Sequence, residues 1–177
     1  QILVIMRNGD FCTTSFDATN HYEADIMIIE KYDSGKTWTA ALNDADQGYP
    51  YLKRFKLEPT QKKQNFLGEN PKSSLILLTD ESFPRFEVVF GGNDAFRDPL
   101  IIDAEEFIGV KSFKAKGKRI STYTVETINE LEPLRKEIPQ PEVPEAELPD
   151  DTDTVTGSQS EGNSDILDEI TGQMKLF

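Results

Sequence analysis

The sequence contains a single cysteine, Cys12, and a single histidine, His21, among 177 residues. One thiol cannot build a disulfide framework or a thiolate metal cluster, so a reducing, cytoplasmic setting fits the chain best. No apolar run approaches the roughly 20 residues that a membrane-spanning helix needs, which argues against a membrane partner. The chain also lacks an initiator methionine and a signal peptide and begins directly with an apolar segment. From this we expect a piece of a longer protein.

The sequence offers no convincing catalytic or metal-binding constellation. His21 is the only possible imidazole base, and a structural or surface role for it is favoured. Asp44 and Asp46 faintly resemble the start of a calcium loop, but Phe55 stands where the last glutamate of such a loop is required. A polar turn is the better interpretation. We therefore predict no catalytic residue, no metal and no cofactor in this chain.

The charge is spread unevenly along the chain, although the formal net charge is -13. Residues 1–125 hold 16 Lys and Arg against 18 Asp and Glu, whereas residues 126–177 hold 3 against 14. The acidity therefore belongs to the C-terminal third. The first part is close to neutral, so a basic cluster within it can act on a partner locally.

Residues 1–125 alternate short apolar segments with turn residues, which predicts an all-β domain built from hairpins. Asn8-Gly9 is the strongest of these turn signals. Turns recur at roughly 35-residue spacing, which is typical of repeated supersecondary units. Too few units are present to close a propeller, so we expect a partial, propeller-like disc or an open solenoid, with helical turns at most near 61–66 and 103–107. The predicted hairpins pair 2–6 with 11–16, 37–42 with 49–57, 75–78 with 85–90, and 107–113 with 118–125.

The composition changes after residue 125. Residues 127–134 could form a short helix or an extended strap, and the rest of 126–163 is a linker rich in Pro, Glu and Asp. Such a segment cannot bury enough surface to offset its ordering entropy, so we expect it to be disordered. Residues 164–177 are expected to form a short helix, with Ser164 as its N-cap, followed by a linear motif.

The most informative segment is FIGVKSFKAKGKRISTY at Phe107–Tyr123, which carries five cations and no acidic residue. We interpret it as a β-hairpin with a cationic tip and an apolar base, for which DNA is the first candidate partner. The alternative is a solvated edge that its lysines protect against aggregation. A second basic run follows Tyr51, where alternation places Lys53 on one strand face and Arg54 and Lys56 on the other. Ordinary cross-strand ion pairing is the alternative there.

GYPYLKRFKLE at Gly48–Glu58 and the Phe107–Tyr123 segment resemble the C-terminal domain of type IIA bacterial topoisomerase A subunits, of the topoisomerase IV or gyrase type found in Bacteroidetes. The resemblance implies a β-pinwheel whose basic rim binds and bends duplex DNA and presents it to a catalytic core. It also implies that catalysis, ATP and Mg belong to other domains, and that the partners are the B subunit and the A-subunit dimer. The gyrase glutamine- and glycine-rich box is absent from this stretch, which favours a topoisomerase IV-like role. The implied rim residues are Lys53, Arg54, Lys56, Lys111, Lys114, Lys116, Lys118 and Arg119.

The chain ends in a motif that resembles the Gln-x-x-Leu-Phe peptide of sliding-clamp partners. Its residues are Gln173, Met174, Lys175, Leu176 and Phe177. The glutamine can hydrogen-bond a polar rim while the apolar side chains fill a pocket, so a sliding clamp is a candidate partner. The alternative is an amphipathic end that packs on its own protein. For the chain as a whole, the rival class is a protein-binding β-repeat adaptor with no DNA role.

Overall fold

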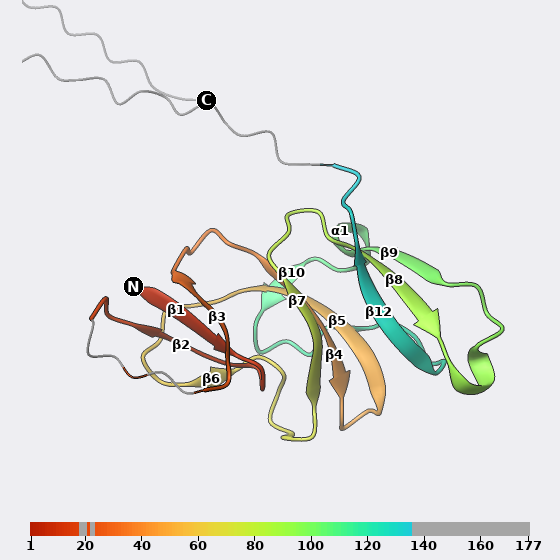
Figure 1. The fold of residues 1–177 in the computed structure, drawn as a ribbon, viewed down its shortest axis with the longest axis horizontal. Coiled ribbons are helices and arrows are strands. Elements are labelled where there is room, and N and C mark those ends of the chain that lie inside the picture. Colours follow the sequence, from red (N-terminus) through yellow and green to blue (C-terminus); the bar gives the residue numbers. More distant parts are fainter. Residues whose placement is uncertain (18–20, 22–23, 136–177) are drawn as a thin grey trace, which may run out of the picture. The chain divides into compact units, whose positions relative to one another are not determined.

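The computed structural model describes residues 1–17, 21 and 24–135. Within them the fold is almost entirely β, which confirms the all-β expectation (Figure 1). The helical turns are the 3-10 turn η1 (Gly92–Asp94) and α1 (Ala104–Phe107), of which α1 coincides with the predicted turn near 103–107. The other predicted turn, near 61–66, contains the short strand β6 (Gln64–Asn65) instead. The predicted linker beyond residue 135 and the C-terminal segment 164–177 lie outside the described residues.

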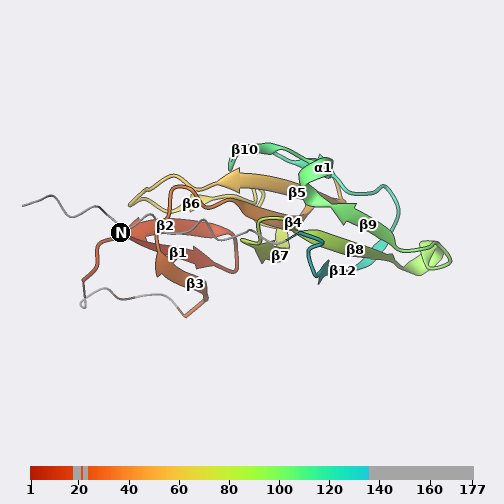
Figure 2. The same cartoon turned by 90° about the horizontal axis from the view of Figure 1, so that it is seen from above.

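The strands form three sheets. The first has the order β3-β1-β2-β6, the second β10-β5-β4-β7 with β11 also paired to β5, and the third β12-β8-β9. Figure 2 shows β3, β7 and β12 along one side of these sheets and β10 on the other. The remaining strands are β1 (Ile2–Met6), β2 (Asp10–Thr14), β3 (Ile26–Lys31), β4 (Trp38–Asp44), β5 (Tyr49–Lys56), β7 (Ser74–Thr79), β8 (Arg85–Phe90), β9 (Leu100–Asp103), β10 (Val110–Ser112), β11 (Lys118–Arg119) and β12 (Val125–Leu131).

Two of the predicted hairpins are confirmed. β1 pairs antiparallel with β2 and β4 with β5. The turns contain Gly9 with φ 83° and Gly48 with φ 71°, a left-handed backbone that glycine adopts without a steric penalty. At Gly9 a Cβ would also lie 2.4 Å from Leu67 Cγ, so a larger residue does not fit there. Local turn chemistry therefore decides these two pairings.

The other two predicted hairpins are wrong. β7 pairs with β4, whereas β8 pairs with β9 and β12 in the third sheet. β10 runs parallel to β5 and β11 runs antiparallel to β5, so the segment around residues 113–117 does not connect a two-stranded hairpin. Apolar alternation marks where strands occur, but the edges left open by neighbouring strands decide which strands pair.

Short strands that follow one sheet in the sequence pair with strands of the sheet before it. β6 follows β5 in sequence but pairs with β2 of the first sheet. In the same way, β10 and β11 follow β9 but pair with β5 of the second sheet. Among the described residues, β9 receives no such strand on its outer edge. Each exchanged segment therefore ties one sheet to the sheet before it.

The exchanged segments also bring aromatic side chains into the core. Phe66, directly after β6, stacks on Phe55 with ring centroids 5.1 Å apart. Phe113, directly after β10, meets Phe11 edge-on at 5.0 Å. All four rings are buried in one hydrophobic cluster. A second cluster joins the second and third sheets and includes Ile128 on β12.

β12 is an extended strand that pairs with β8 along Val125–Leu131. Of the two predicted forms, a short helix or an extended strap, residues 125–131 take the extended one. The third sheet continues past residue 125, the predicted end of the hairpin domain, because β12 ends at Leu131. Burial of Ile128 attaches this strand to the core and makes it part of the β domain.

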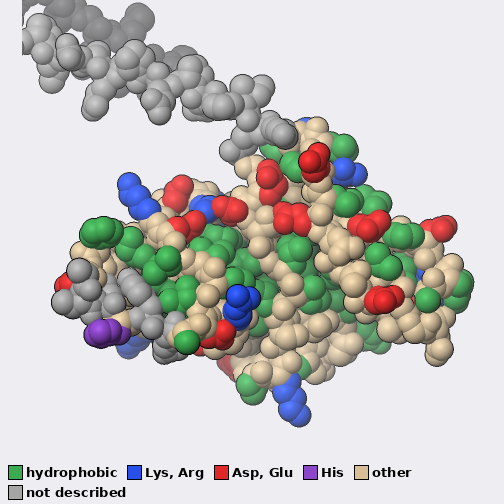
Figure 3. All heavy atoms as spheres, in the orientation of Figure 1, with side chains coloured by type: hydrophobic (Ala, Val, Ile, Leu, Met, Phe, Trp, Pro, Cys, Tyr) green, Lys and Arg blue, Asp and Glu red, His purple; other side chains and the backbone are tan. Residues whose placement is uncertain are grey.

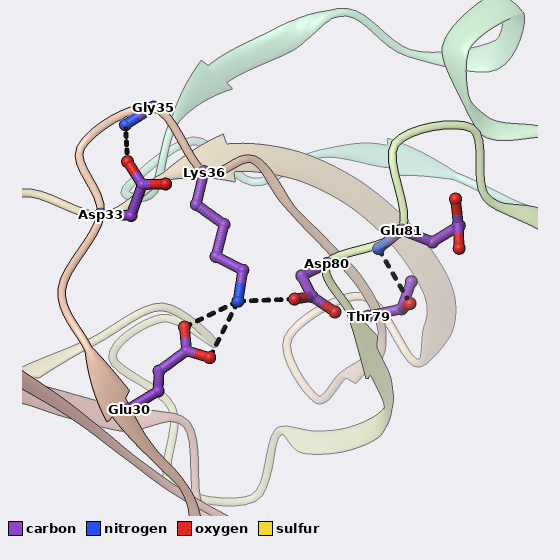
Figure 4. Close-up of polar contacts among 7 residues, drawn as sticks. All are labelled: Glu30, Asp33, Gly35, Lys36, Thr79, Asp80 and Glu81. Atoms are coloured by element: carbon purple, nitrogen blue, oxygen red, sulfur yellow. Dashed lines mark hydrogen bonds and ion pairs between the residues drawn. The ribbon is translucent and has the colours of Figure 1, made fainter. Parts of the chain in front are cut away.

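A partly exposed ion-pair network links the first two sheets. Lys36, in the loop before β4, donates to both carboxylate oxygens of Glu30 at 2.8 Å and contacts Asp80 at 2.5 Å (Figure 4). Glu30 lies on β3 and Asp80 follows β7. Burial by itself lowers the pKa of Lys36, but its bonds to Asp80 and Glu30 outweigh this and raise the pKa above its ordinary value.

Candidate nucleic-acid interface

The cationic segment folds against the outer edge of β5. Val110 to Ser112 align with Arg54 to Lys56, and β11 aligns with Tyr51 and Leu52. The connection between β10 and β11 therefore passes back over the middle of β5. Gly117 makes this approach possible, because a Cβ there would lie 2.5 Å from the carbonyl oxygen of Leu52 and its φ is 95°.

Six of the predicted rim cations are exposed along this edge. We call them the basic edge: Lys56, Lys111, Lys114, Lys116, Lys118 and Arg119. Figure 3 shows a different face, over β3 and β7, on which hydrophobic side chains gather and Lys and Arg are scattered. The tertiary structure thus places cations from β5, β10, β11 and their connection along one edge of the second sheet.

Contacts with aromatic rings and carbonyls hold several of these cations in place. Lys118 Nζ donates to Phe107 O at 3.2 Å and lies 4.2 Å from the centroid of the Phe107 ring. Arg119 lies over the ring of Tyr49 at 4.9 Å. Such cation–π contacts orient a side chain while its charge stays accessible to solvent. The basic edge is therefore partly pre-organised for an anionic partner.

Lys116 is the one member of the basic edge with a carboxylate partner among the described residues. Its Nζ lies 3.1 Å from Asp44 Oδ2. Burial raises the pKa of Asp44, but hydrogen bonds from Lys116 and from the amides of Gln47 and Asp46 outweigh it and leave the pKa below its ordinary value. Asp44 ends β4, and Asp46 lies in the turn before β5, where its amide donates to Asp44 Oδ1. This is the polar turn that the sequence favoured over a calcium loop. No cluster that could hold a metal ion occurs among the residues described.

Lys53, a predicted rim residue, lies inside the protein. It is 4 % exposed, and its Nζ donates to the carbonyl oxygens of Phe66 and Phe113 at 2.6 Å each. Burial lowers the pKa of Lys53 to about 8. Lys53 thus connects the two exchanged segments beneath the basic edge and cannot touch an external ligand. The sequence held a signal for this, because Lys53 shares a strand face with the buried Phe55.

Arg54 is also buried, at 7 % exposed, and does not belong to the basic edge. Its Nη2 donates weakly to Ser82 O at 3.4 Å, and its Nε has no hydrogen-bond partner among the described residues. The family resemblance had implied a place at the rim, and strand alternation had put Arg54 on the face opposite Phe55. His21 is exposed, and the Gln173–Phe177 motif lies outside the described residues.

The described residues form an all-β module of three sheets, tied together by exchanged strands, with exposed cations along one edge of the second sheet. The family model of the topoisomerase C-terminal domain of Bacteroidota matches residues 1–132, and the chain belongs to this family. The resemblance to a topoisomerase C-terminal domain is thereby confirmed, while the A-subunit assignment stays a prediction. No curated protein and no solved structure matches the chain. No helix in the described part is long and apolar enough to cross a membrane.

Proposed function

We propose that this chain binds and bends duplex DNA as the C-terminal part of a type II topoisomerase A subunit. In this role it selects the DNA segment that is presented to the catalytic core. The observation that carries the proposal is the basic edge, in which six exposed cations gather on a domain of near-neutral charge. Membership of the topoisomerase C-terminal domain family supports it.

The proposed mechanism is electrostatic. Each cation that contacts a phosphate releases condensed counterions, so six contacts give a slope of about −5 in a plot of log affinity against log salt concentration. In the parent protein, cations on successive units would favour bent DNA, and bending costs a few kcal/mol that additional phosphate contacts offset. Such contacts do not read base edges, so binding should be largely independent of sequence.

The exchanged strands are consistent with a β-pinwheel, which we propose as the architecture of the parent protein. The outer edge of β9, with the exposed Leu100 and Ile101, would then receive the exchanged strand of another unit. ATP, Mg and the catalytic residues would belong to other domains, and the B subunit and the A-subunit dimer would be reached through the core. This assignment places the protein in the cytoplasm with the nucleoid.

Fluorescence anisotropy with a labelled duplex tests the proposal. Reversal of Lys114, Lys116 and Lys118 to Glu should lower the affinity and flatten the salt dependence by about three units of slope. The matched control reverses three exposed lysines away from β5: Lys31, Lys62 and Lys72.

Both variants change the net charge by the same amount. A loss of affinity in the Lys114, Lys116, Lys118 variant alone therefore identifies the basic edge as the DNA-binding surface. Equal losses in the two variants would contradict the proposal. Absence of any salt-sensitive binding by the wild type would favour the protein-binding adaptor instead.

A further inference from the structure

The guanidinium group of Arg54 makes fewer hydrogen bonds than its burial requires. A guanidinium carries five N–H donors and stays protonated at any ordinary pH. Among the described residues, the contact of Nη2 with Ser82 O at 3.4 Å is the only hydrogen bond that the Arg54 side chain makes, and Nε makes none. Buried polar groups without partners are costly, and a bound ion or water is a common reason for their presence.

Arg54 lines a cavity of about 630 Å³ at the end of β5. The walls come from the loop before β4, from β5, from the connection between β7 and β8, and from α1 and β10. A water molecule occupies roughly 30 Å³ of liquid, so the cavity has ample room for a tetrahedral oxyanion with its hydration. Arg54, which has unused donors, therefore lines a space that a ligand can enter.

Asp80 and Asp33, two of the three carboxylates that line this cavity, already have partners in the protein. Asp80 contacts Lys36, which also binds Glu30 (Figure 4). Asp33 accepts a hydrogen bond from the amide of Gly35 at 2.7 Å and thereby closes its own turn (Figure 4). Lys36 is neutralised by this network and adds little attraction for an anion.

The third carboxylate, Glu105 of α1, pairs with Arg135 at 3.0 Å. Arg54 and Lys56 are the lining cations to which no described carboxylate is bound. They lie on the same face of β5, because side chains two residues apart on a strand point to the same side. Two cations without an ion-pair partner among the described residues thus lie on one wall of the cavity.

We propose that Arg54 and Lys56 form a binding site for a single phosphate group. The planar fork of arginine matches two oxygens of a tetrahedral oxyanion, and Lys56 supplies a second charge at the mouth. The phosphate has two chemical sources: free inorganic phosphate, or a phosphodiester of DNA that also lies on the basic edge, which Lys56 shares. The second source rests on the proposed function, whereas the first stands without it.

NMR of the full chain labelled with ¹⁵N tests the site directly, because arginine Nε–H groups give their own signals. Inorganic phosphate is added at constant ionic strength, with chloride as the balancing ion. We expect one arginine signal to shift and saturate, and the same signal to be missing in Arg54→Lys.

Lys56→Gln should weaken the phosphate affinity roughly tenfold, as expected for the loss of one charge-assisted hydrogen bond. This variant changes an exposed residue, so it keeps the test decisive should Arg54→Lys fail to fold. Lys72→Gln, an exposed lysine away from the cavity, is the matched control and should leave the affinity unchanged. A signal unmoved by tens of millimolar phosphate, or a shift equal in Lys56→Gln and the wild type, would overturn the site.

A short duplex added to the same sample separates the two sources. If the occupant is a DNA phosphodiester, the duplex shifts the Arg54 signal and inorganic phosphate competes with it. If the occupant is free phosphate, duplex and phosphate bind independently and the Arg54 signal responds to phosphate alone. Failure of the duplex to bind anywhere would remove the proposed function, while the phosphate titration would still decide on the Arg54–Lys56 site.

Discussion

Raising the pH from about 8 to about 10 should stabilise this protein relative to a Lys53→Met variant. The pKa of Lys53 is lowered by burial from 10.5 to about 8 in the folded chain. In the unfolded chain the group regains its ordinary pKa, so between these values the unfolded state binds more protons than the folded state. The free energy of unfolding therefore rises with pH in this window, and the cost of burying the ammonium is fully present below about pH 8.

The size of the effect follows from the difference between the two pKa values. Each pKa unit corresponds to about 1.4 kcal/mol, so the full difference is roughly 3 kcal/mol, of which about 2 kcal/mol falls between pH 8 and pH 10. The deprotonated amine still has two N–H donors for the carbonyls of Phe66 and Phe113, so the contacts at 2.6 Å survive deprotonation. Only the charge is lost, which is why stability increases.

Urea unfolding of both proteins at several pH values measures this contribution. Every other ionisable group is present in both proteins, so the difference between the two curves isolates Lys53. We expect the free energy of unfolding of the wild type to rise by about 2 kcal/mol relative to that of Lys53→Met between pH 8 and pH 10. Parallel curves would refute the assignment of Lys53 as a buried, charged group at neutral pH.

Three further predictions concern the basic edge and the C-terminal region. Gly117→Ala should destabilise the fold by about 1–3 kcal/mol, because a Cβ there meets the backbone and φ is 95°, and it should also weaken DNA binding. Gly109→Ala, with open space and no left-handed backbone, should be neutral in both assays, and equal effects would count against the close approach. Removal of 136–177, which keeps β12 intact, should tighten DNA binding at low salt because it removes 11 acidic and 2 basic residues, a net −9 of the −13, and unchanged or weaker binding would argue against competition by this segment. Wild type should recover a sliding clamp in a pull-down better than the double variant Gln173→Ala, Phe177→Ala, and equal recovery would remove the clamp hypothesis.

The parts of this fold that could be predicted from the sequence are those that local chemistry decides. Asn8-Gly9 and the turn at Gly48 fix two hairpins, because glycine tolerates a left-handed backbone and the adjoining strands alternate. The gathering of cations between Lys111 and Arg119 is likewise visible in the sequence, since they are close in the chain. The burial of Lys53 agrees with its place on the same strand face as the buried Phe55. A lysine residue by itself, however, gives no reason to expect a buried side chain.

The amino-acid pattern is enough to predict a mostly β chain with a local basic cluster and with most of its net negative charge after residue 125. The pairing of β6, β10 and β11 with strands of the preceding sheet is visible in the folded protein alone. Both faces of β5 are buried from Pro50 to Phe55, so Lys53 and Arg54 lie inside the protein, whereas Lys56 at the end of the strand is exposed. The physical reason is that strand periodicity sets which side chains share a face, whereas the exposure of that face depends on a segment arriving from a distant part of the chain.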